Sequence, residues 1–255
     1  MKRAPDLVTP VVFVAFLLIV WEIAVRGLNV PPYILPTPSA MAVAVAYNLP
    51  ILAASAWTTL SMALAALAVA SLLAMATAFG LGLSPLAEKA VKPLAVILQV
   101  TPVVAIAPLV NIWAGLDHPQ RAVIGLAAVV AFFPIFSGAM TGLNSADPDL
   151  ERLFDLYGAN RLQRLLKLRL PTSVPFLLEG HKVAAGLAVI GAVVAEFVSG
   201  SGGSQGLAWR LLEAANRLQT AKLFAALLVL GLMGVAANAL FQALETIMLK
   251  RWRGR

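Results

Sequence analysis

The longest uncharged stretch of the sequence limits the fold more than any other feature. Residues 27–87 contain no charged side chain, and the whole chain of 255 residues is 60% hydrophobic but only 12% charged. Soluble domains carry about 25% charged residues. A chain with half that share, arranged in long apolar runs, folds with the lipid bilayer as its solvent. We therefore predict an all-α, polytopic membrane protein in which residues 1–255 form a single transmembrane domain.

The apolar segments indicate how often the chain crosses the membrane. A helix crosses about 30 Å of hydrocarbon with about 20 residues. Six segments meet this requirement, at residues 7–25, 56–82, 94–114, 121–143, 174–198 and 221–248. A proline cluster from Pro31 to Pro50 predicts an extended surface loop before the second span. Ser39 is then the expected N-cap of a short interfacial helix over about residues 39–49.

The first apolar run has two interpretations. It extends from Leu7 to Ala24 behind Lys2 and Arg3, as in a secretory signal peptide. The run is longer than the apolar core of a usual signal peptide, and no small-x-small cleavage site follows it. We interpret it as the first membrane span.

The basic residues set the expected orientation, because Lys and Arg accumulate in cytoplasmic loops. We place the N-terminus in the cytoplasm and let six spans alternate. Of the 19 Lys and Arg residues, the outer segments then hold Arg26, Arg121, Arg210, Arg217 and Lys222. All the others fall on the cytoplasmic side. This asymmetry predicts both termini in the cytoplasm, and it assigns the net charge of +7 to the membrane rather than to nucleic acid.

The sequence lacks the residues that several kinds of catalytic or binding site require. The chain has no Cys and only two His, so thiol catalysis is excluded and a metal site is not expected. No Gly-x4-Gly-Lys-Ser/Thr phosphate loop occurs. Ser201 lies in a glycine-rich turn, but no His follows His181 to act as the base of an intramembrane serine hydrolase.

A secondary transporter driven by ions or protons is the main alternative among transport proteins. Such a protein needs ionisable groups deep in its spans. Glu22, Glu196 and Glu245 are the available carboxylates, and all lie near the ends of predicted spans. We keep this class as the alternative hypothesis.

A polar segment of about 25 residues, 147–171, lies between the fourth and fifth spans on the predicted cytoplasmic side. Two short helices, over 149–156 and 159–168, are expected to meet at Gly158, whose backbone can turn left-handed, and Pro171 is expected to stop the second. Arg161, Arg164 and Lys167 share one helical face. Such charges are typical of simple cytoplasmic anchors, but two angled helices also form a knob that fits a groove on a partner protein.

The spacing within this segment resembles a known family. From Gly158, nine residues lead to Leu168-Arg169-Leu170-Pro171, which is the Gly-x9-apolar-x-Leu-Pro pattern of the cytoplasmic coupling loop in ABC-importer permeases. Further segments, in the same order and close to the same spacing, resemble the nitrate/sulfonate/taurine branch of binding-protein-dependent permeases. These are Trp21-Glu22, Leu35-Pro36-Thr37-Pro38-Ser39, Pro102 to Leu109 with Trp113-Ala114-Gly115, and Ala195-Glu196.

The resemblance implies a type I importer permease of the bacterial inner membrane that is itself no enzyme. It implies a homodimer, two ATP-binding subunits that hold ATP and Mg, an extracytoplasmic substrate-binding protein, and no cofactor on this chain. The substrate would be a small organic or nitrate-like solute. The residues that would couple to the ATPase are Leu153, Phe154, Asp155, Gly158, Ala159, Asn160, Arg161, Leu168, Leu170 and Pro171. One departure is that Arg152-Leu153-Phe154 replaces the family's Glu-Ala-Ala, with Glu151 one position early.

The third and fifth predicted spans have the composition of a translocation path. Prolines open the helix ladder of the third span, and glycines allow close approach in the fifth. The path candidates are Gln99, Thr101, Pro102, Ala105, Pro108, Asn111, Gly186 and Gly191. Glu196 is expected to be a structural carboxylate with hydrogen-bond partners, for which the following glycine turn is one source. His181 is expected to be a satisfied interfacial side chain rather than a gate.

Overall fold

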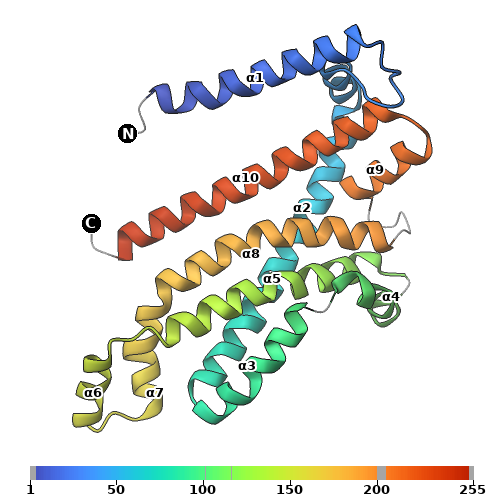
Figure 1. Ribbon diagram of the computed structural model, residues 1–255. Coiled ribbons are helices and arrows are strands. Elements are labelled where there is room, and N and C mark those ends of the chain that lie inside the picture. Colours follow the sequence, from blue (N-terminus) through green and yellow to red (C-terminus); the bar gives the residue numbers. More distant parts are fainter. Residues whose placement is uncertain (1–3, 101, 116, 200–204, 253–255) are drawn as a thin grey trace. The chain divides into compact units, whose positions relative to one another are not determined.

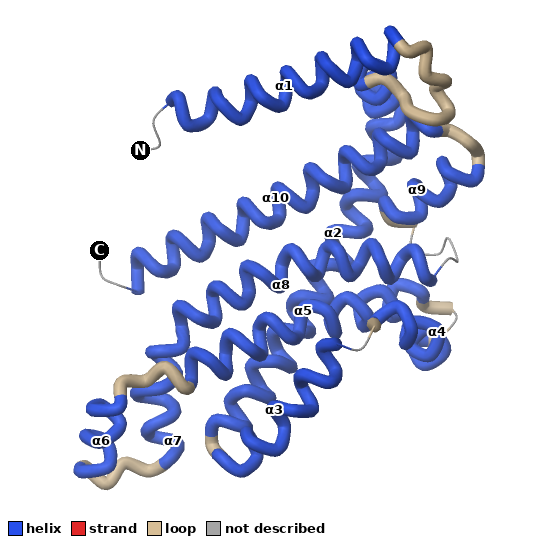
Figure 2. The backbone as a smooth tube through the Cα atoms, in the orientation of Figure 1, coloured by secondary structure: helices blue, strands red, loops and turns tan. Residues whose placement is uncertain are grey.

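All the regular secondary structure in the part of the chain that the structure describes is helical. The computed structural model describes residues 4–100, 102–115, 117–199 and 205–252, which contain no strand (Figures 1 and 2). The elements are α1 (Ala4–Gly27), α2 (Pro38–Gly82), α3 (Pro85–Val100), α4 (Val103–Ala114), α5 (Pro119–Leu143), α6 (Pro148–Leu156), α7 (Arg161–Arg164), the π-helix η1 (Leu165–Arg169), α8 (Leu170–Ser199), α9 (Leu207–Asn216) and α10 (Thr220–Trp252).

Five helical segments of the described residues are long and apolar enough to cross a membrane. They are Thr9–Gly27, Pro38–Gly82, Pro119–Leu143, Arg161–Ser199 and Thr220–Lys250. The predicted third span over 94–114 is instead divided into α3 and α4, and α4 has 12 residues, too few to cross alone. Pro102 lacks an N–H and precedes α4, so the helix ladder is interrupted there.

The predicted proline-rich loop before the second span is confined to residues 28–37, and the predicted separate interfacial helix is wrong. Residues 39–49 belong to α2, a single helix of 45 residues that continues through Pro50. A helix of that length extends about 68 Å, more than twice the hydrocarbon thickness. Proline removes one backbone hydrogen bond, which a long apolar helix can tolerate. Ser39 is not the N-cap, because the Thr37 hydroxyl accepts the backbone N–H of Ala40 at 3.2 Å.

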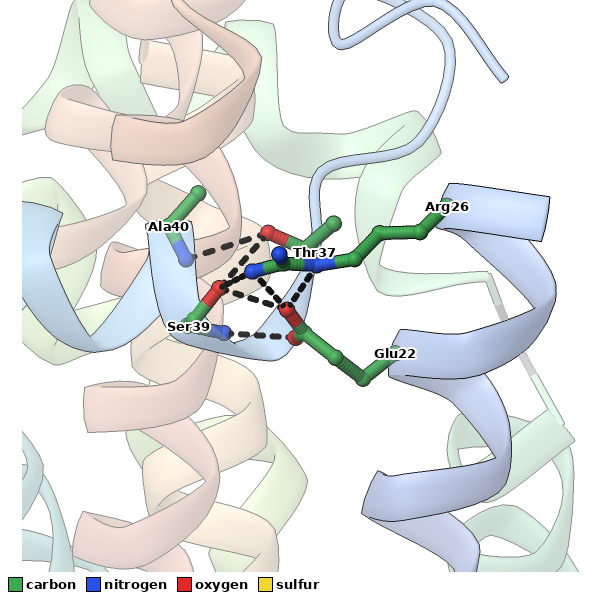
Figure 3. A network of polar contacts seen from close by, with 5 residues as sticks. All are labelled: Glu22, Arg26, Thr37, Ser39 and Ala40. Atoms are coloured by element: carbon green, nitrogen blue, oxygen red, sulfur yellow. Dashed lines mark hydrogen bonds and ion pairs between the residues drawn. The ribbon is translucent and has the colours of Figure 1, made fainter. Parts of the chain in front are cut away.

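The contacts divide the chain into two compact units, residues 1–57 with 205–231 and residues 58–204 with 232–255. In the first unit a polar cluster joins the end of α1 to the start of α2 (Figure 3). The Glu22 carboxylate accepts from the Ser39 backbone N–H at 3.0 Å and from its hydroxyl at 2.7 Å. Arg26 donates to the same carboxylate at 2.7 Å. Two sequence segments that carry the family resemblance therefore meet in one hydrogen-bonded cluster.

Helix α9 in the first unit was not anticipated from the sequence. Its Leu207, Ala208, Leu211 and Ala214 are buried at helical spacing. Arg210 on the same helix donates to Ser55 Oγ at 3.1 Å and to Glu213 at 2.9 Å. The helical spacing of these apolar residues could have predicted the helix from the sequence. It was missed because the helix has only 10 residues and lies within a stretch that we interpreted as an external connection.

The second unit is built around the close packing of α5 and α8 (Figure 1). A Cβ atom at Gly138 would lie 2.6 Å from the Phe176 carbonyl oxygen, and one at Gly180 would lie 2.7 Å from the Pro134 carbonyl oxygen. Small residues let helix backbones approach closely where lipid offers no hydrophobic drive for association. Helix α2 contributes a row of small residues to the same core. These are the buried Ala66, Ala70, Ala74 and Ala78.

Candidate coupling loop and membrane path

The loop between α5 and α8 forms two capped short helices. The Asp147 side chain accepts from the Asp149 N–H at 2.8 Å at the start of α6. At the end of α6, the Ala159 N–H donates to the Phe154 carbonyl and the Gly158 N–H to the Asp155 carbonyl, both at 3.0 Å. This pair of bonds is a Schellman motif, which requires a left-handed residue after the helix. Gly158 has φ of 65°, which confirms the predicted conformation of this glycine.

The second short helix begins with a capping box. The Asn160 side chain accepts from the Gln163 N–H at 2.8 Å, and the Gln163 side chain accepts from the Asn160 N–H at 2.9 Å. Each bond satisfies a backbone donor that the helix itself leaves open. The turn between α6 and α7 is thus defined on both sides of Ala159.

The prediction that Pro171 ends the second helix is wrong. The chain passes from α7 through the π-helix η1 directly into α8, which begins at Leu170 and contains Pro171 in its first turn. A proline at this position can be accommodated because η1 widens the backbone ladder before it, so the ring meets a ladder that is already altered. The second short helix of the loop is therefore continuous with a membrane-spanning segment.

Ion pairs hold the two short helices together. Arg169 Nε lies 2.7 Å from Glu151, and Arg164 lies 3.3 Å from the other oxygen of Glu151 and also pairs with Asp155. The side chains of Glu151, Arg164 and Arg169 are only 20 to 27% exposed. Arg164 therefore stabilises the loop internally and does not share an outward face with Lys167, which is exposed. From the sequence, Glu151 was singled out only because it stands one position before the Glu of the family pattern. Its partners Arg164 and Arg169, which are 13 and 18 positions away, were not predicted.

The loop exposes several large apolar side chains to its surroundings. Leu156 and Tyr157 are 84% and 81% exposed, and Leu150, Leu153 and Leu162 are also exposed. We call these five residues the apolar knob. Of the other predicted coupling residues, Leu168 is buried, and Arg161 donates to the Leu83 carbonyl at 3.4 Å. Exposed apolar patches rimmed by charges are typical of protein interaction sites.

The path candidates do not all lie in one place. Asn111 accepts from the Ser199 hydroxyl at 3.1 Å, which joins α4 to α8. Gly191 packs under α5, with a Cβ position 3.0 Å from the Ala127 Cα, whereas no atom lies within 4 Å of the corresponding position at Gly186. Thr101 lies outside the described residues. The exposed candidates are Gln99, Pro102, Ala105 and Pro108.

The other singled-out residues have hydrogen-bond partners. Glu196 is 3% exposed and accepts from the Thr59 hydroxyl at 2.9 Å. The glycine turn that we considered as a source of donors lies outside the described residues. His181 Nδ1 lies 2.7 Å from the Leu177 carbonyl oxygen, as expected of a satisfied side chain. Thr59 is a partner that sequence reasoning missed, since it is 137 positions from Glu196.

Comparison with known proteins identifies the family. Residues 70–254 match the model of the binding-protein-dependent transport system inner membrane component. The formylaminopyrimidine transport permease protein ThiX of Halalkalibacterium halodurans is 32% identical over 99% of both chains. The putative aliphatic sulfonates transport permease protein SsuC of Bacillus subtilis is 30% identical over 68% of this chain and 60% of its own. The nitrate import permease protein NrtB of Leptolyngbya laminosa is 28% identical over 68% of this chain and 60% of its own.

These matches agree with the all-helical fold, the apolar spans and the spacing of the loop after Gly158. The chain is an integral membrane protein, and it belongs to the permease components of binding-protein-dependent ABC transporters, within the branch that contains sulfonate and nitrate permeases.

Proposed function

We propose that this chain forms, as a homodimer with six spans per copy, the translocation path of an ATP-driven importer in the bacterial inner membrane. Two ATP-binding subunits hold ATP and Mg, and a substrate-binding protein delivers a small organic solute on the outer side. The apolar knob supports this proposal most directly, because five large apolar side chains project from a capped, ion-paired loop on the side where basic residues accumulate.

The proposed mechanism follows from the helical continuity of the loop with α8. Closure of an ATPase pair on ATP would displace the knob, and η1 would transmit this displacement to α8 without a flexible connection. Because α8 packs closely on α5, both helices would move as one body. Substrate access would then alternate between the two sides of the membrane.

Co-purification tests the docking surface. Leu156→Glu places a charge within the knob, and we expect the ATP-binding subunit to be lost from the purified complex. Leu218→Glu is the matched control, since Leu218 is 81% exposed but lies on the predicted outer side. Retention of the subunit by Leu156→Glu would contradict docking at the knob.

Orientation is tested separately. A reporter fused after Arg255 should be active in the cytoplasm, and one inserted within Ser201–Ser204 should be active outside. The opposite pattern at either position would contradict six spans with cytoplasmic termini. Uptake that persists without ATP and follows an ion gradient would instead support the secondary-transporter alternative.

A further inference from the structure

A groove of ≈ 340 Å³ lies between α8 and α10 in the second unit. Its lining consists of Met75 of α2, residues of α8 between Val174 and His181, and residues of α10 between Phe241 and Met248. We call it the α8–α10 groove. All of its described lining residues except His181 and Glu245 are apolar. Its volume is at the lower end of the range of small-molecule sites, about 300–1,000 Å³.

The groove lies where the apolar stretch of α10 gives way to its basic end. Lys250 follows Glu245 by five positions, which is about 7.5 Å of helix rise. Leu244 and Met248 of the lining are 44% and 51% exposed on this membrane-spanning helix. The groove is therefore open to lipid close to the boundary between the hydrocarbon and the headgroups.

The two polar residues of the lining offer hydrogen-bond acceptors. His181 Nδ1 lies 2.7 Å from the Leu177 carbonyl oxygen, which can only accept, so Nδ1 carries the proton. In the neutral ring Nε2 is then an acceptor, and no described residue donates to it. The Glu245 carboxylate is the second acceptor. A ligand that satisfies both groups must supply N–H or O–H donors.

The ion pairs beside the groove favour a cationic ligand. Lys182 Nζ lies 2.9 Å from Glu179 and 3.2 Å from Glu245, so one ammonium group serves two carboxylates. The Glu245 side chain is only 15% exposed. A charge in a covered site of a membrane protein is costly unless it is paired. A second ammonium group at Glu245 would give each carboxylate a cation of its own.

We propose that the α8–α10 groove binds a membrane lipid with a primary ammonium head, of the phosphatidylethanolamine type. The ammonium group has a positive charge and three N–H donors, which match the Glu245 carboxylate and His181 Nε2. The first part of an acyl chain would pack on the apolar lining, and the rest would extend into the bilayer. Lys250, which is exposed, would be available to the lipid phosphate. This binding depends neither on the transported solute nor on the direction of transport.

Native mass spectrometry of the full-length permease tests the headgroup. Phosphatidylethanolamine, phosphatidylcholine and phosphatidylglycerol with identical acyl chains are titrated separately. We expect phosphatidylethanolamine to bind about tenfold more tightly than the other two, because choline has no N–H donor and glycerol no positive charge. Glu245→Gln should weaken phosphatidylethanolamine binding about tenfold, since a charge-assisted hydrogen bond is lost. Glu213→Gln is the matched control, because Glu213 is an ion-paired carboxylate with 16% exposure that does not line the groove.

A filling variant keeps the proposal testable if Glu245→Gln folds poorly. Leu178→Trp narrows the groove without removing either acceptor, and it should lose the bound lipid. Leu72→Trp should retain the lipid, because Leu72 is 72% exposed and lies outside the lining.

Three results would overturn the inference. The first is equal affinity for the three lipids, or phosphatidylethanolamine binding that both groove variants leave unchanged. The second is a free long-chain alkylamine that binds as tightly as phosphatidylethanolamine, which would assign the groove to a soluble amphiphile. The third is complete disulfide crosslinking of two copies through Leu244→Cys, in a chain without other Cys, which would show that a second copy covers the groove.

Discussion

The Glu22 carboxylate caps the first turn of α2 by accepting both the backbone N–H and the hydroxyl of Ser39, 17 positions along the chain (Figure 3). Pro38 has no N–H to satisfy, Ser39 donates to Glu22, and Ala40 donates to the Thr37 hydroxyl. The open backbone donors at the start of this long apolar helix are thus paired one by one.

We expect Glu22→Ala to destabilise the first unit, because hydrogen bonds to a charged group are lost and the N-terminus of α2 is uncapped. The melting temperature in detergent measures the effect. Ser71→Ala is the control, since the Ser71 hydroxyl donates within its own helix to Leu67. Equal melting temperatures for the two variants would show that the cap does not stabilise the unit.

Gly158→Val should uncouple the transporter. A β-branched residue at φ of 65° costs about 1–2 kcal/mol or more, so the turn between α6 and α7 should be distorted. We expect membrane insertion to be retained and substrate-stimulated ATP hydrolysis to be lost in the reconstituted complex. Gly80→Val is the control, because Gly80 lies in α2 with ordinary helical φ and no atom within 4 Å of its Cβ position. Normal stimulation in Gly158→Val would refute the coupling role.

Glu151→Gln should destabilise the same loop by removing ion pairs rather than by distorting its turn. It removes the charge that Arg164 and Arg169 share in a largely covered site, which leaves Arg169 without its ion-pair partner and Arg164 paired with Asp155 alone. We expect at least a tenfold loss of ATP-dependent transport. Asp149→Asn should have little effect, because the Asp149–Arg152 pair is 85% and 78% exposed and such pairs contribute about 0–1 kcal/mol. Similar transport by both variants would be evidence that the ion pairs of Glu151 do not stabilise the loop.

The contact between α5 and α8 should not tolerate a methyl group. Gly138→Ala would place a carbon 2.6 Å from a backbone oxygen that cannot move independently, at a cost of about 1–3 kcal/mol. Gly125→Ala on the same helix meets its nearest atom at 3.7 Å, so it should be nearly neutral. Thermal unfolding in detergent compares the two, and a neutral Gly138→Ala would show that the helices separate more easily than the structure indicates.

The first unit should lose stability in acid. The hydrogen bond from Arg210 holds the pKa of Glu213 below its usual value, and Lys222 and Arg217 add to this effect against burial. A carboxyl whose pKa is lowered by folding stabilises the fold above its unfolded pKa, and this contribution is lost as the pH falls through the lower, folded pKa. The melting temperature should therefore fall below a pH of about 4.3. The melting temperature of Glu213→Gln should change less over the same pH range. An unchanged dependence of its melting temperature on pH would show that Glu213 does not cause the loss of stability in acid.

The sequence by itself determined the class of this protein. Apolar runs long enough to cross a bilayer are a local property, and so is the spacing from Gly158 to Pro171 that identified the family. The left-handed turn at Gly158 was also predictable, because only a short stretch of chain decides the end of a helix. The single-domain organisation and all of the path residues stay predictions.

Only the tertiary structure decided which distant residues are partners. Thr59 meets Glu196, Arg169 meets Glu151, and Glu22 meets Ser39, and no periodicity in the sequence relates these positions. The same holds for the continuity of α2 through Pro50 and of η1 into α8 through Pro171. Proline disfavours a helix locally by a few kcal/mol, but in a bilayer a broken helix exposes further backbone groups that no water can satisfy. That larger cost applies to the whole span, which is why local rules placed these helix ends wrongly.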